Sequence, residues 1–346
     1  MAKKAPLGPS GLIVVDKPAG LTSHDVVSKM RWIAGTRKVG HAGTLDPMAT
    51  GVLILGVNKA TRLLTYVVGE TKTYTATIRL GVSTLTDDAD GEAVGFAAPG
   101  TVASVTDAAL EAEIAKLTGD IQQVPSAVSA IKVDGVRSYA RVRAGEEVDL
   151  HARPVTVHSF TVHEKRTATA SYPIEGEEVS GDVLDLDVTV VCSAGTYIRA
   201  LARDLGAALG IGGHLTALRR TAIGDIRAED AYTLDDLIAG REAEEPAPLL
   251  PIEEAARRLF AVRTLTAAEA TDLANGRRIT PTQGQGETTK PKGGSVGGHD
   301  KPTTDGLTAA FAPNGTLVAI IENTRFRREN VAAPVLVFES GTTFKD

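Results

Sequence analysis

Short apolar runs alternate with polar turns along the first 250 residues, without a regular repeat of strand, helix and strand. Residues 11–15 (GLIVV) form one such run and predict a strand that ends in the turn 16–20 (DKPAG). Ser23 then precedes a segment whose apolar residues recur at helical spacing, which predicts a helix with Ser23 as its cap. Strands and helices mixed in this way favour an α+β fold over a doubly wound parallel sheet.

Two longer segments are rich in β-branched residues. Residues 73–80 (TYTATIRL) predict a strand that stops at a glycine. Residues 183–192 (VLDLDVTVVC) alternate between apolar and polar side chains and then become apolar, which predicts a strand that has one wet face before it enters the core. Between these segments, residues 107–118 carry apolar side chains at helical spacing and predict a helix.

The chain changes character near its last hundred residues. An acidic segment rich in Ala and Pro, 238–251, predicts a junction between a domain 1–250 and a smaller domain 251–346. In the smaller domain the pattern predicts a helix near 266–275 and a strand at 317–321.

The smaller domain is interrupted by a polar segment, residues 282–305. Val296 is its only sizeable apolar side chain. Because so little burial cannot offset the entropy of ordering, we expect a disordered insert that arose as a tolerated loop expansion.

Length and composition are those of an ordinary globular protein. The chain has 346 residues, of which 42% are hydrophobic and 23% charged, and this length predicts roughly two domains. No apolar run resembles a signal peptide or is long enough to span a bilayer. The single cysteine, Cys192, cannot form an internal disulfide, and we expect a cytoplasmic protein without a membrane segment.

The net charge of −6 is unevenly distributed. Residues 1–62 contain nine Lys or Arg and three Asp, whereas residues 225–256 contain ten acidic residues and two arginines. Since the local field governs the binding of a polyanion, the basic N-terminal part is compatible with a nucleic-acid partner. A solvated basic face without a partner fits the charges equally well.

Asp46 is the first candidate for chemistry. It lies in residues 41–51 (HAGTLDPMATG), directly before the apolar run 52–57. Pro47 restricts the backbone of Asp46 to extended conformations, and the neighbouring glycines allow tight turns. We therefore expect the carboxylate on a stiff loop that enters a sheet, as a pre-organised catalytic group requires. An isolated Asp-Pro pair is also typical of a plain turn.

Arg199 is the second candidate, because it lies in the first turn of a predicted helix and off its apolar stripe. An arginine there can pair bidentately with a carboxylate and keep it ionised, although a surface arginine would have the same pattern. Tyr74 can present a ring to a base or pack in the core. Residues 129–143 interleave four basic side chains with Tyr139, which suits an RNA contact or a solvated loop.

The sequence lacks the motifs of several common kinds of catalytic site. No Cys/His spacing suits zinc, and neither a phosphate-binding glycine motif nor a nucleophile elbow is present. We therefore expect chemistry that needs no metal, nucleotide or redox cofactor. A lone histidine such as His41 is more often structural than catalytic.

Taken together, several segments closely resemble the bacterial tRNA pseudouridine-55 synthases, the TruB family. In the family's order they are VDKPAGLTSHDVV (15–27), GHAGTLDPMATGVL (40–53), KTYTA (72–76), QQVPSAVSAIKVDGVRSYARVRAGEEV (122–148), CSAGTYIRALARDLG (192–206) and GGHLTALRRTAIG (212–224). The family's small PUA-like RNA-binding domain is resembled by LTAAEATDLANGRRI (265–279) and NGTLVAIIE (314–322). The insert 282–305 departs from the family pattern.

The resemblance implies the pseudouridine synthase fold, a mixed and mainly antiparallel sheet flanked by helices, followed by a β-rich PUA-like domain. It implies an isomerase that converts a uridine in the T-loop of tRNA, position 55 in tRNA numbering, into pseudouridine. The N1–C1′ bond breaks and the uracil is rejoined through C5. The expected partner is the T-arm stem-loop, clamped by a thumb at about 125–152. The enzyme is expected to act as a monomer, with no cofactor and no obligatory protein partner.

The resemblance also assigns roles. Asp46 is the essential carboxylate, as a nucleophile or as a base on the ribose, and Arg199 pairs with it. Tyr74 lies against the uracil and assists proton removal from C5, while Leu218 walls the pocket. Since the uridine must be flipped out of its loop, His41 braces the vacated space. The remaining expected substrate contacts are Tyr197, Lys17 and Lys132.

Three alternatives stay open at this stage. The same fold can serve an RNA-binding module without catalysis, against which the intact set of Asp46, Tyr74 and Arg199 argues. A related isomerase can act on another RNA or through a guide-RNA complex, against which the long thumb argues. A hydrolase can use Asp46 on a small glycoside, but it lacks a second carboxylate nearby in the sequence.

Overall fold

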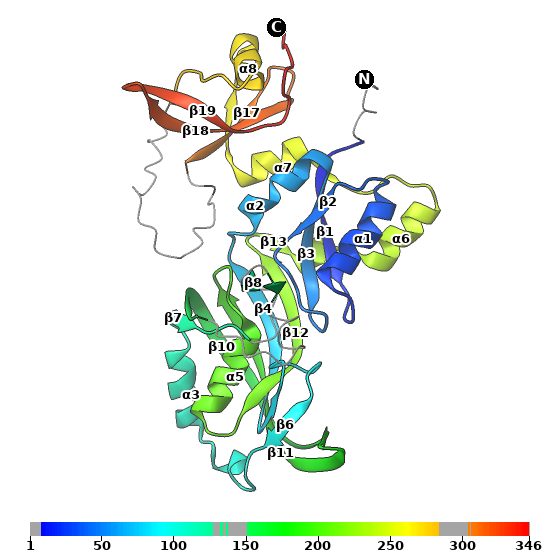
Figure 1. Cartoon of the computed structure of the whole chain (residues 1–346), viewed down its shortest axis with the longest axis vertical. Coiled ribbons are helices and arrows are strands. Elements are labelled where there is room, and N and C mark those ends of the chain that lie inside the picture. The colour runs from blue at the N-terminus through cyan, green and yellow to red at the C-terminus, as the bar shows by residue number, and fades with distance from the viewer. Residues whose placement is uncertain are drawn as a thin grey trace.

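The chain folds around two β-sheets, one of eleven strands and one of four (Figure 1). The structure is a computed structural model that describes residues 8–126, 132–133, 136–137, 151–283, 304 and 306–345. The large sheet occupies the middle and lower part of Figure 1, and the small sheet lies above it with the C-terminus.

The large sheet is mixed and mainly antiparallel. Its main path runs in the order β14-β1-β3-β12-β4-β11-β10-β7, with β2, β13 and β15 attached at its side. Two neighbouring pairs, β1 with β14 and β3 with β12, are parallel, and the other pairs are antiparallel. The predicted α+β class is therefore confirmed. The strands are β1 (Gly11–Lys17), β2 (Val39–Ala42), β3 (Thr50–Val57), β4 (Lys72–Leu80), β7 (Gly119–Gln123), β10 (Arg153–Ile174), β11 (Glu177–Cys192), β12 (Gly213–Ile223), β13 (Ile226–Arg227), β14 (Tyr232–Thr233) and β15 (Leu250–Pro251).

Helices flank this sheet and bury their apolar faces against it. α1 contributes Val26 and Met30, both fully buried, and α5 contributes Leu201 and Leu205. Two small hairpins, β5–β6 and β8–β9, form separate two-stranded sheets. The remaining elements are α1 (Ser23–Ile33), η1 (Asn58–Arg62), α2 (Leu64–Val67), β5 (Val82–Thr84), β6 (Ala93–Phe96), η2 (Val102–Ser104), α3 (Asp107–Lys116), β8 (Lys132–Val133), β9 (Val136–Arg137), α5 (Ile198–Ala208), η3 (Ala228–Asp230), α6 (Leu234–Glu242) and α7 (Ile252–Leu259).

The cap of α1 differs from the prediction. Thr22 is the N-cap, and it forms a capping box with Asp25, so the predicted cap at Ser23 is wrong by one residue. Ser23 is 1% exposed and bonds instead to both backbone groups of Leu45. A hydroxyl that is buried in this way is withdrawn from capping because it serves a tertiary contact.

The strand predicted at 183–192 begins earlier, at Glu177. Residues 177–182 pair with the far end of β10, so β10 and β11 form a long hairpin that leaves the core. The prediction missed this part because an exposed ribbon needs no apolar alternation.

The small sheet runs β16 (Ala261–Thr264), β17 (Leu307–Phe311), β18 (Leu317–Phe326) and β19 (Glu329–Val337), with α8 (Ala267–Ala274) packed on it. The helix predicted near 266–275 and the strand at 317–321 are therefore both confirmed. α7 lies between the two sheets (Figure 1). There the Arg257 guanidinium lies 3.8 Å from the centre of the Phe311 ring, and the two sheets share an apolar cluster.

Three features of the domain organisation stay predictions: the boundary, the thumb and the insert. The last strand of the large sheet ends at Pro251 and the small sheet begins at Ala261, while the boundary at 250/251 itself stays a prediction. Most of the predicted thumb (125–152) and of the predicted insert (282–305) lies outside the described residues. Within the described part of the chain, no helix is both long and apolar enough to cross a membrane.

Gly51 permits the close approach of β3 and β12. Its φ is +101°, and a Cβ built on it would lie 2.2 Å from the backbone oxygen of Arg220, its partner in the parallel pair. A side chain there would therefore push apart the two strands that border the site described below.

We expect Gly51→Ala to lower the free energy of unfolding by about 2–5 kcal/mol. The left-handed backbone contributes ~1–2 kcal/mol, and displacement of packed backbone contributes ~1–3 kcal/mol. Gly100→Ala is the matched control, because Gly100 has a φ of +80° and no atom within 4 Å of its built Cβ. Urea unfolding of the two variants measures the difference. Equal losses would show that the strand contact at Gly51 does not matter.

Candidate active site

The backbone around Asp46 is fixed on both sides. Leu45 bonds through its N–H and its carbonyl to the buried Ser23 hydroxyl, at 2.9 and 3.1 Å. The Pro47 carbonyl accepts from the Lys17 ammonium at 3.1 Å and from the Gly20 N–H at 2.9 Å. The loop that precedes β3 therefore has little freedom, and the direction of the Asp46 side chain is set by the fold.

Arg199, in the first turn of α5, grips the Asp46 carboxylate with two hydrogen bonds. Its Nε donates to Oδ2 at 2.9 Å and its Nη2 donates to Oδ1 at 3.2 Å. The arginine is 3% exposed, whereas the Asp46 side chain keeps 35% of its surface accessible. The alternative of a surface arginine is thus wrong. A planar guanidinium in a bidentate pair fixes the orientation of its carboxylate.

A second carboxylate shares Arg199. Asp88, in the turn between β5 and β6, has an oxygen 3.4 Å from the Arg199 Nε, and the Thr86 carbonyl accepts from Nη1 at 2.7 Å. Asp88 is 4% exposed and accepts from the Thr86 hydroxyl and the Asp90 N–H. Burial raises the pKa of Asp88, while its bond to Thr86 and the charge of Arg199 oppose that rise. This residue was absent from the predicted site.

A cavity of about 250 Å³ opens in front of Asp46. Ala194, Gly195 and Thr196, in the turn after β11, form one of its sides, and Asp88 is not among its lining residues. No group of three or more metal-ligating side chains occurs in the described ranges. The lining residues are Gly43, Thr44, Leu45, Asp46, Val68, Lys72, Tyr74, Ala194, Gly195, Thr196, Tyr197, Ile198, Arg199, Leu218 and Arg220.

Tyr74 and Leu218 supply the apolar floor of the cavity from adjacent strands. Leu218 on β12 pairs with Ala76 on β4, two residues beyond Tyr74, and each of the two side chains is 7% exposed. Burial raises the pKa of the Tyr74 phenol, and the charge of Arg220 opposes this rise. At neutral pH the phenol is therefore a protonated, apolar surface with one polar end.

Arg220 and Lys72 bring two further buried cations to the cavity, and the sequence reasoning missed both. Arg220 is 1% exposed and donates to the Val52 carbonyl at 2.7 Å and to the Gly43 carbonyl at 3.0 Å. Lys72 is 5% exposed and donates to the backbone of the turn before β4. The sequence did contain a signal for Arg220: it is a charged residue within a strand whose apolar residues predict burial, and a buried charge needs a specific partner.

His41 lies on β2, on the chain segment that leads to Asp46, and its ring meets that of His24 edge-on at 5.4 Å. Burial lowers the pKa of His41 to about 4, and the charges of His24 and Arg220 act in the same direction. The imidazole is therefore uncharged at physiological pH. Its Nδ1 has no hydrogen-bond partner among the described residues.

The other predicted substrate contacts, Tyr197, Lys17 and Lys132, lie in different environments. Tyr197 lines the cavity as the N-cap of α5, and Gln123 bonds to both of its backbone groups. Lys17 is fully buried and does not line the cavity; its ammonium donates to the carbonyls of Pro18, Leu21 and Pro47. The expected contact of Lys17 with the substrate stays a prediction, and in the structure its ammonium holds the loop of Asp46 through the Pro47 carbonyl. The Lys132 side chain lies outside the described residues.

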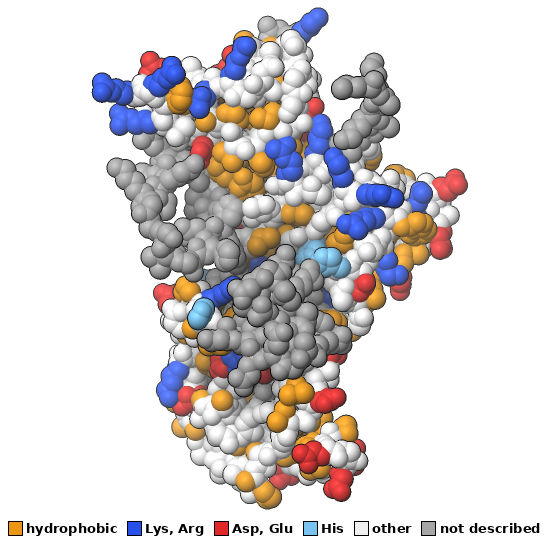
Figure 2. Space-filling model, viewed as in Figure 1, with side chains coloured by type: hydrophobic (Ala, Val, Ile, Leu, Met, Phe, Trp, Pro, Cys, Tyr) orange, Lys and Arg blue, Asp and Glu red, His pale blue; other side chains and the backbone are white. Residues whose placement is uncertain are grey.

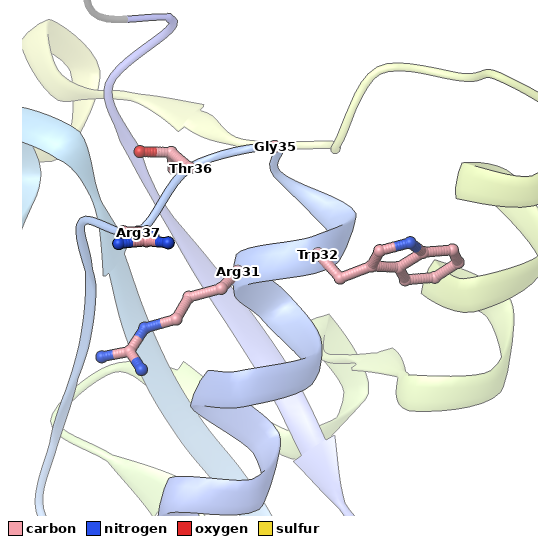
Figure 3. Close-up of a pocket in the computed structure, with 5 residues that line it drawn as sticks. All are labelled: Arg31, Trp32, Gly35, Thr36 and Arg37. Atoms are coloured by element: carbon pink, nitrogen blue, oxygen red, sulfur yellow. The ribbon is translucent and has the colours of Figure 1, made fainter.

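A larger hollow of about 600 Å³ lies at the end of α1 (Figure 3). Arg31 and Arg37 line one side of it, while Trp32 points away from both of them toward the neighbouring helix. The residues that line this hollow include no carboxylate, and their one hydroxyl, that of Thr36, donates to the Asn58 side chain at 2.9 Å. The smaller Asp46 cavity is therefore the better candidate for the chemistry. The exposed arginines of the hollow nevertheless leave a positive surface on the segment that leads to His41.

Comparisons with known proteins agree with this geometry. Residues 31–198 match the TruB family pseudouridylate synthase (N terminal domain), and residues 199–257 match the tRNA pseudouridylate synthase B C-terminal domain. The chain is 57% identical over 329 residues to the tRNA pseudouridine synthase B of Arthrobacter sp. (strain FB24), covering 95% of this chain and 96% of that protein. The chain belongs to the TruB family of pseudouridine synthases.

Two more similarities define the extent of this relationship. The tRNA pseudouridine synthase B of Paenarthrobacter aurescens (strain TC1) is 57% identical over 333 residues, which cover 96% of each chain. An H/ACA RNP bound to a substrate RNA containing 2′-deoxyuridine has a chain of similar fold, with a TM-score of 0.61 and 23% identity, covering 97% of this chain and 87% of that one. The predicted pseudouridine synthase fold is therefore confirmed over nearly the whole length.

We expect Arg199→Lys to lower kcat for pseudouridine formation by about 10²-fold, because an ammonium cannot hold both oxygens and a small misplacement is costly. Arg203→Lys, one turn further along α5, is the control, since Arg203 pairs with Asp204 at 2.8 Å. Single-turnover kinetics at saturating RNA provide the measurement. The role of the bidentate grip is refuted if both variants react at the wild-type rate.

Lys17→Met should destabilise the protein by about 2–4 kcal/mol, since three carbonyls lose their donor. Burial lowers the pKa of Lys17 to about 8, so at neutral pH the native ammonium still carries three protons for these bonds. Because Pro47 adjoins Asp46, kcat should fall as well. Lys29→Met, at an exposed position on α1, should change neither quantity. Thermal unfolding and initial rates compare the two variants.

Proposed function

We propose that this enzyme isomerises a uridine in the T-loop of tRNA, position 55 in tRNA numbering, to pseudouridine. The observation that carries the proposal is a single accessible carboxylate, Asp46, gripped by a buried arginine at a cavity with an apolar floor. The curated relatives with 57% identity carry the name of this activity on tRNA.

Each lining residue has a defined task in this proposal. Arg199 holds the Asp46 carboxylate in a fixed direction, which serves attack at C1′, addition at C6 and a glycal route alike. Tyr74 lies along one face of the uracil and assists the loss of the C5 proton, while Leu218 supports the base. Since the carboxylate lies inside a cavity, the nucleotide must leave its loop to reach it. The neutral His41 ring occupies the vacated place by stacking.

The geometry weighs against the glycoside hydrolase. Glycosidases need two carboxyl groups that flank the scissile bond, one of them as an acid. Asp88 is the spatial neighbour that the sequence could not reveal, but it is buried behind Arg199 and does not line the cavity. Among the described residues that line the cavity, Asp46 is the one that carries a carboxylate and can therefore present it to a substrate.

We propose partners and a compartment on the same basis. The chain acts as a monomer in the cytoplasm, on the T-arm stem-loop and without an obligatory protein partner. The tRNA pseudouridine synthases B share 57% identity with this chain over nearly its whole length, and this similarity supports a direct tRNA substrate. Tritium release by the purified chain alone tests this part of the proposal.

The decisive experiment is tritium release from a T-arm stem-loop labelled with [5-³H]uridine, without added metal or nucleotide. Asp46→Asn should lower the rate by at least ~10⁴-fold, as loss of a sole nucleophile or base does. Its affinity for the RNA should be unchanged, because the amide is isosteric with the carboxylate. Release by neither protein, with RNA still bound, would favour the binding module. Equal release by both would contradict the role of Asp46.

A further inference from the structure

The hairpin of β10 and β11 extends beyond the part of the sheet that holds it. β4 pairs with β11 up to Leu184, while β10 and β11 continue together to Ile174 and Glu177. Residues 167–183 contain four acids and neither Lys nor Arg. Figure 2 shows Asp and Glu side chains at the lower end of the molecule, where Figure 1 places the tip of this hairpin. Since like charges repel, the hairpin is unsuited to binding RNA, and its role lies within the fold.

β6 packs on the far part of this hairpin. The Phe96 ring lies edge-on to that of Tyr172, with 5.9 Å between their centres. A Cβ built on Gly181 would collide with the same phenylalanine ring, so this glycine of β11 leaves the space that Phe96 fills. In Figure 1 β6 accordingly lies beside β11 at the bottom of the sheet. The hairpin therefore supports β5–β6, whose turn presents Asp88 to Arg199.

Tyr172 also takes part in a chain of hydrogen bonds. Arg79 holds Asp185 with two bonds of 2.7 Å and donates through Nη1 to the Tyr172 hydroxyl at 3.2 Å. That hydroxyl lies 3.2 Å from Nε2 of His214, and Nδ1 of His214 lies 3.0 Å from the Val82 carbonyl. Because a carbonyl can only accept, Nδ1 carries a proton. The chain thus ends on the first residue of β5.

His214 is the fully buried member of this chain. Burial lowers the pKa of its imidazole and the charge of Arg79 acts in the same direction, while the bond to Val82 opposes them. The ring is therefore neutral at physiological pH, so Nε2 has no proton and accepts from the Tyr172 hydroxyl. An imidazole that is bonded at both nitrogens is fixed in its tautomer and in its orientation.

Leu215, the next residue of β12, holds the other end of the β5–β6 turn. Its N–H donates to the Asp87 carbonyl at 3.1 Å, and it forms an isolated β-bridge with Asp88. This turn supplies two acceptors to Arg199, the Asp88 carboxylate at 3.4 Å and the Thr86 carbonyl at 2.7 Å. Adjacent positions of one strand therefore hold the start of β5 and the acceptors of Arg199 in a fixed relation.

We propose that Tyr172 and His214 are positioning residues for the isomerisation at Asp46. They hold the β5–β6 turn, the turn sets the plane of the Arg199 guanidinium, and that plane sets the direction of the Asp46 carboxylate. Neither side chain lines the Asp46 cavity, so both act through Arg199 and not on the substrate. Because a guanidinium is rigid and planar, a rotation at one edge also moves the other edge. The identity of the reaction rests on the proposed function.

Tyr172→Phe tests this proposal, because it removes one hydroxyl and keeps the ring that packs on Phe96. His214 then loses the donor to its Nε2, and the turn is held less firmly. In initial-rate tritium release from the T-arm stem-loop, kcat should fall about tenfold, since a small misplacement of a catalytic group is costly. KM should stay at the wild-type value, because the acidic hairpin does not contact the RNA.

Ser171→Ala is the matched control. It removes a hydroxyl that bonds to Ser180 at 2.6 Å in the same hairpin, outside the chain to His214, and it should leave kcat unchanged. A second arm combines Tyr172→Phe with Arg199→Lys. Since Tyr172 acts through Arg199, the combined variant should be no slower than Arg199→Lys alone. Losses that multiply, an equal loss in the control, or an unchanged kcat in Tyr172→Phe would each overturn the proposal.

A spectroscopic readout separates this proposal from the proposed function. The Nε–H resonance of Arg199, identified by its absence in Arg199→Lys, should shift in Tyr172→Phe and stay in place in Ser171→Ala. If the wild type released no tritium but this shift was present, the proposed function would fail and the positioning role would be upheld. If the enzyme was active and the resonance did not move, the positioning role would fail and the proposed function would be upheld.

Discussion

The bidentate pair between Asp46 and Arg199 is the interaction on which the arrangement of the site depends. It joins residues 153 positions apart, one on a loop before β3 and one at the start of α5. Both elements are anchored to the same sheet, so the pair is correct only when that sheet is complete. Taking two charges partly out of water opposes the Coulomb attraction, and the benefit of the pair is therefore orientation more than net stability.

Buried cations that bind backbone carbonyls surround this pair. Lys17 holds three carbonyls around the loop of Asp46, Lys72 holds two in the turn before β4, and Arg220 holds two near Gly43. A cation that bonds to fixed carbonyls is satisfied without a carboxylate beside it. These cations therefore stiffen the loops without adding a carboxylate to the cavity. Asp46 remains the one accessible acid among the described residues that line it, so no second carboxylate competes with it for the substrate.

The sequence predicts those site residues that are constrained by their neighbours along the chain, and it misses those that are placed by tertiary contacts. Asp46 and Arg199 were candidates because Pro47 and the helix start constrain them locally, and their roles were predicted from the resemblance to the TruB family. Asp88 was not, because the turn contains four acids and only the folded β5–β6 turn decides which of them is buried. Arg219 and Arg220 are adjacent on β12, yet the first pairs with Asp16 at the surface and the second is buried. Alternation predicts that one is inside but not which.

The distribution of charge explains how a chain of net charge −6 can bind a polyanion. The cations of the core are occupied by carbonyls and add little to the outer field, so the positive field at the surface comes from exposed groups such as Arg31 and Arg37. The acids on α6 lie on a helix that packs beside α1, and salt screens the part of their field that acts beyond about 8–10 Å. Orientation at the cavity and attraction at the surface come from separate sets of charges, which allows each to change without disturbing the other.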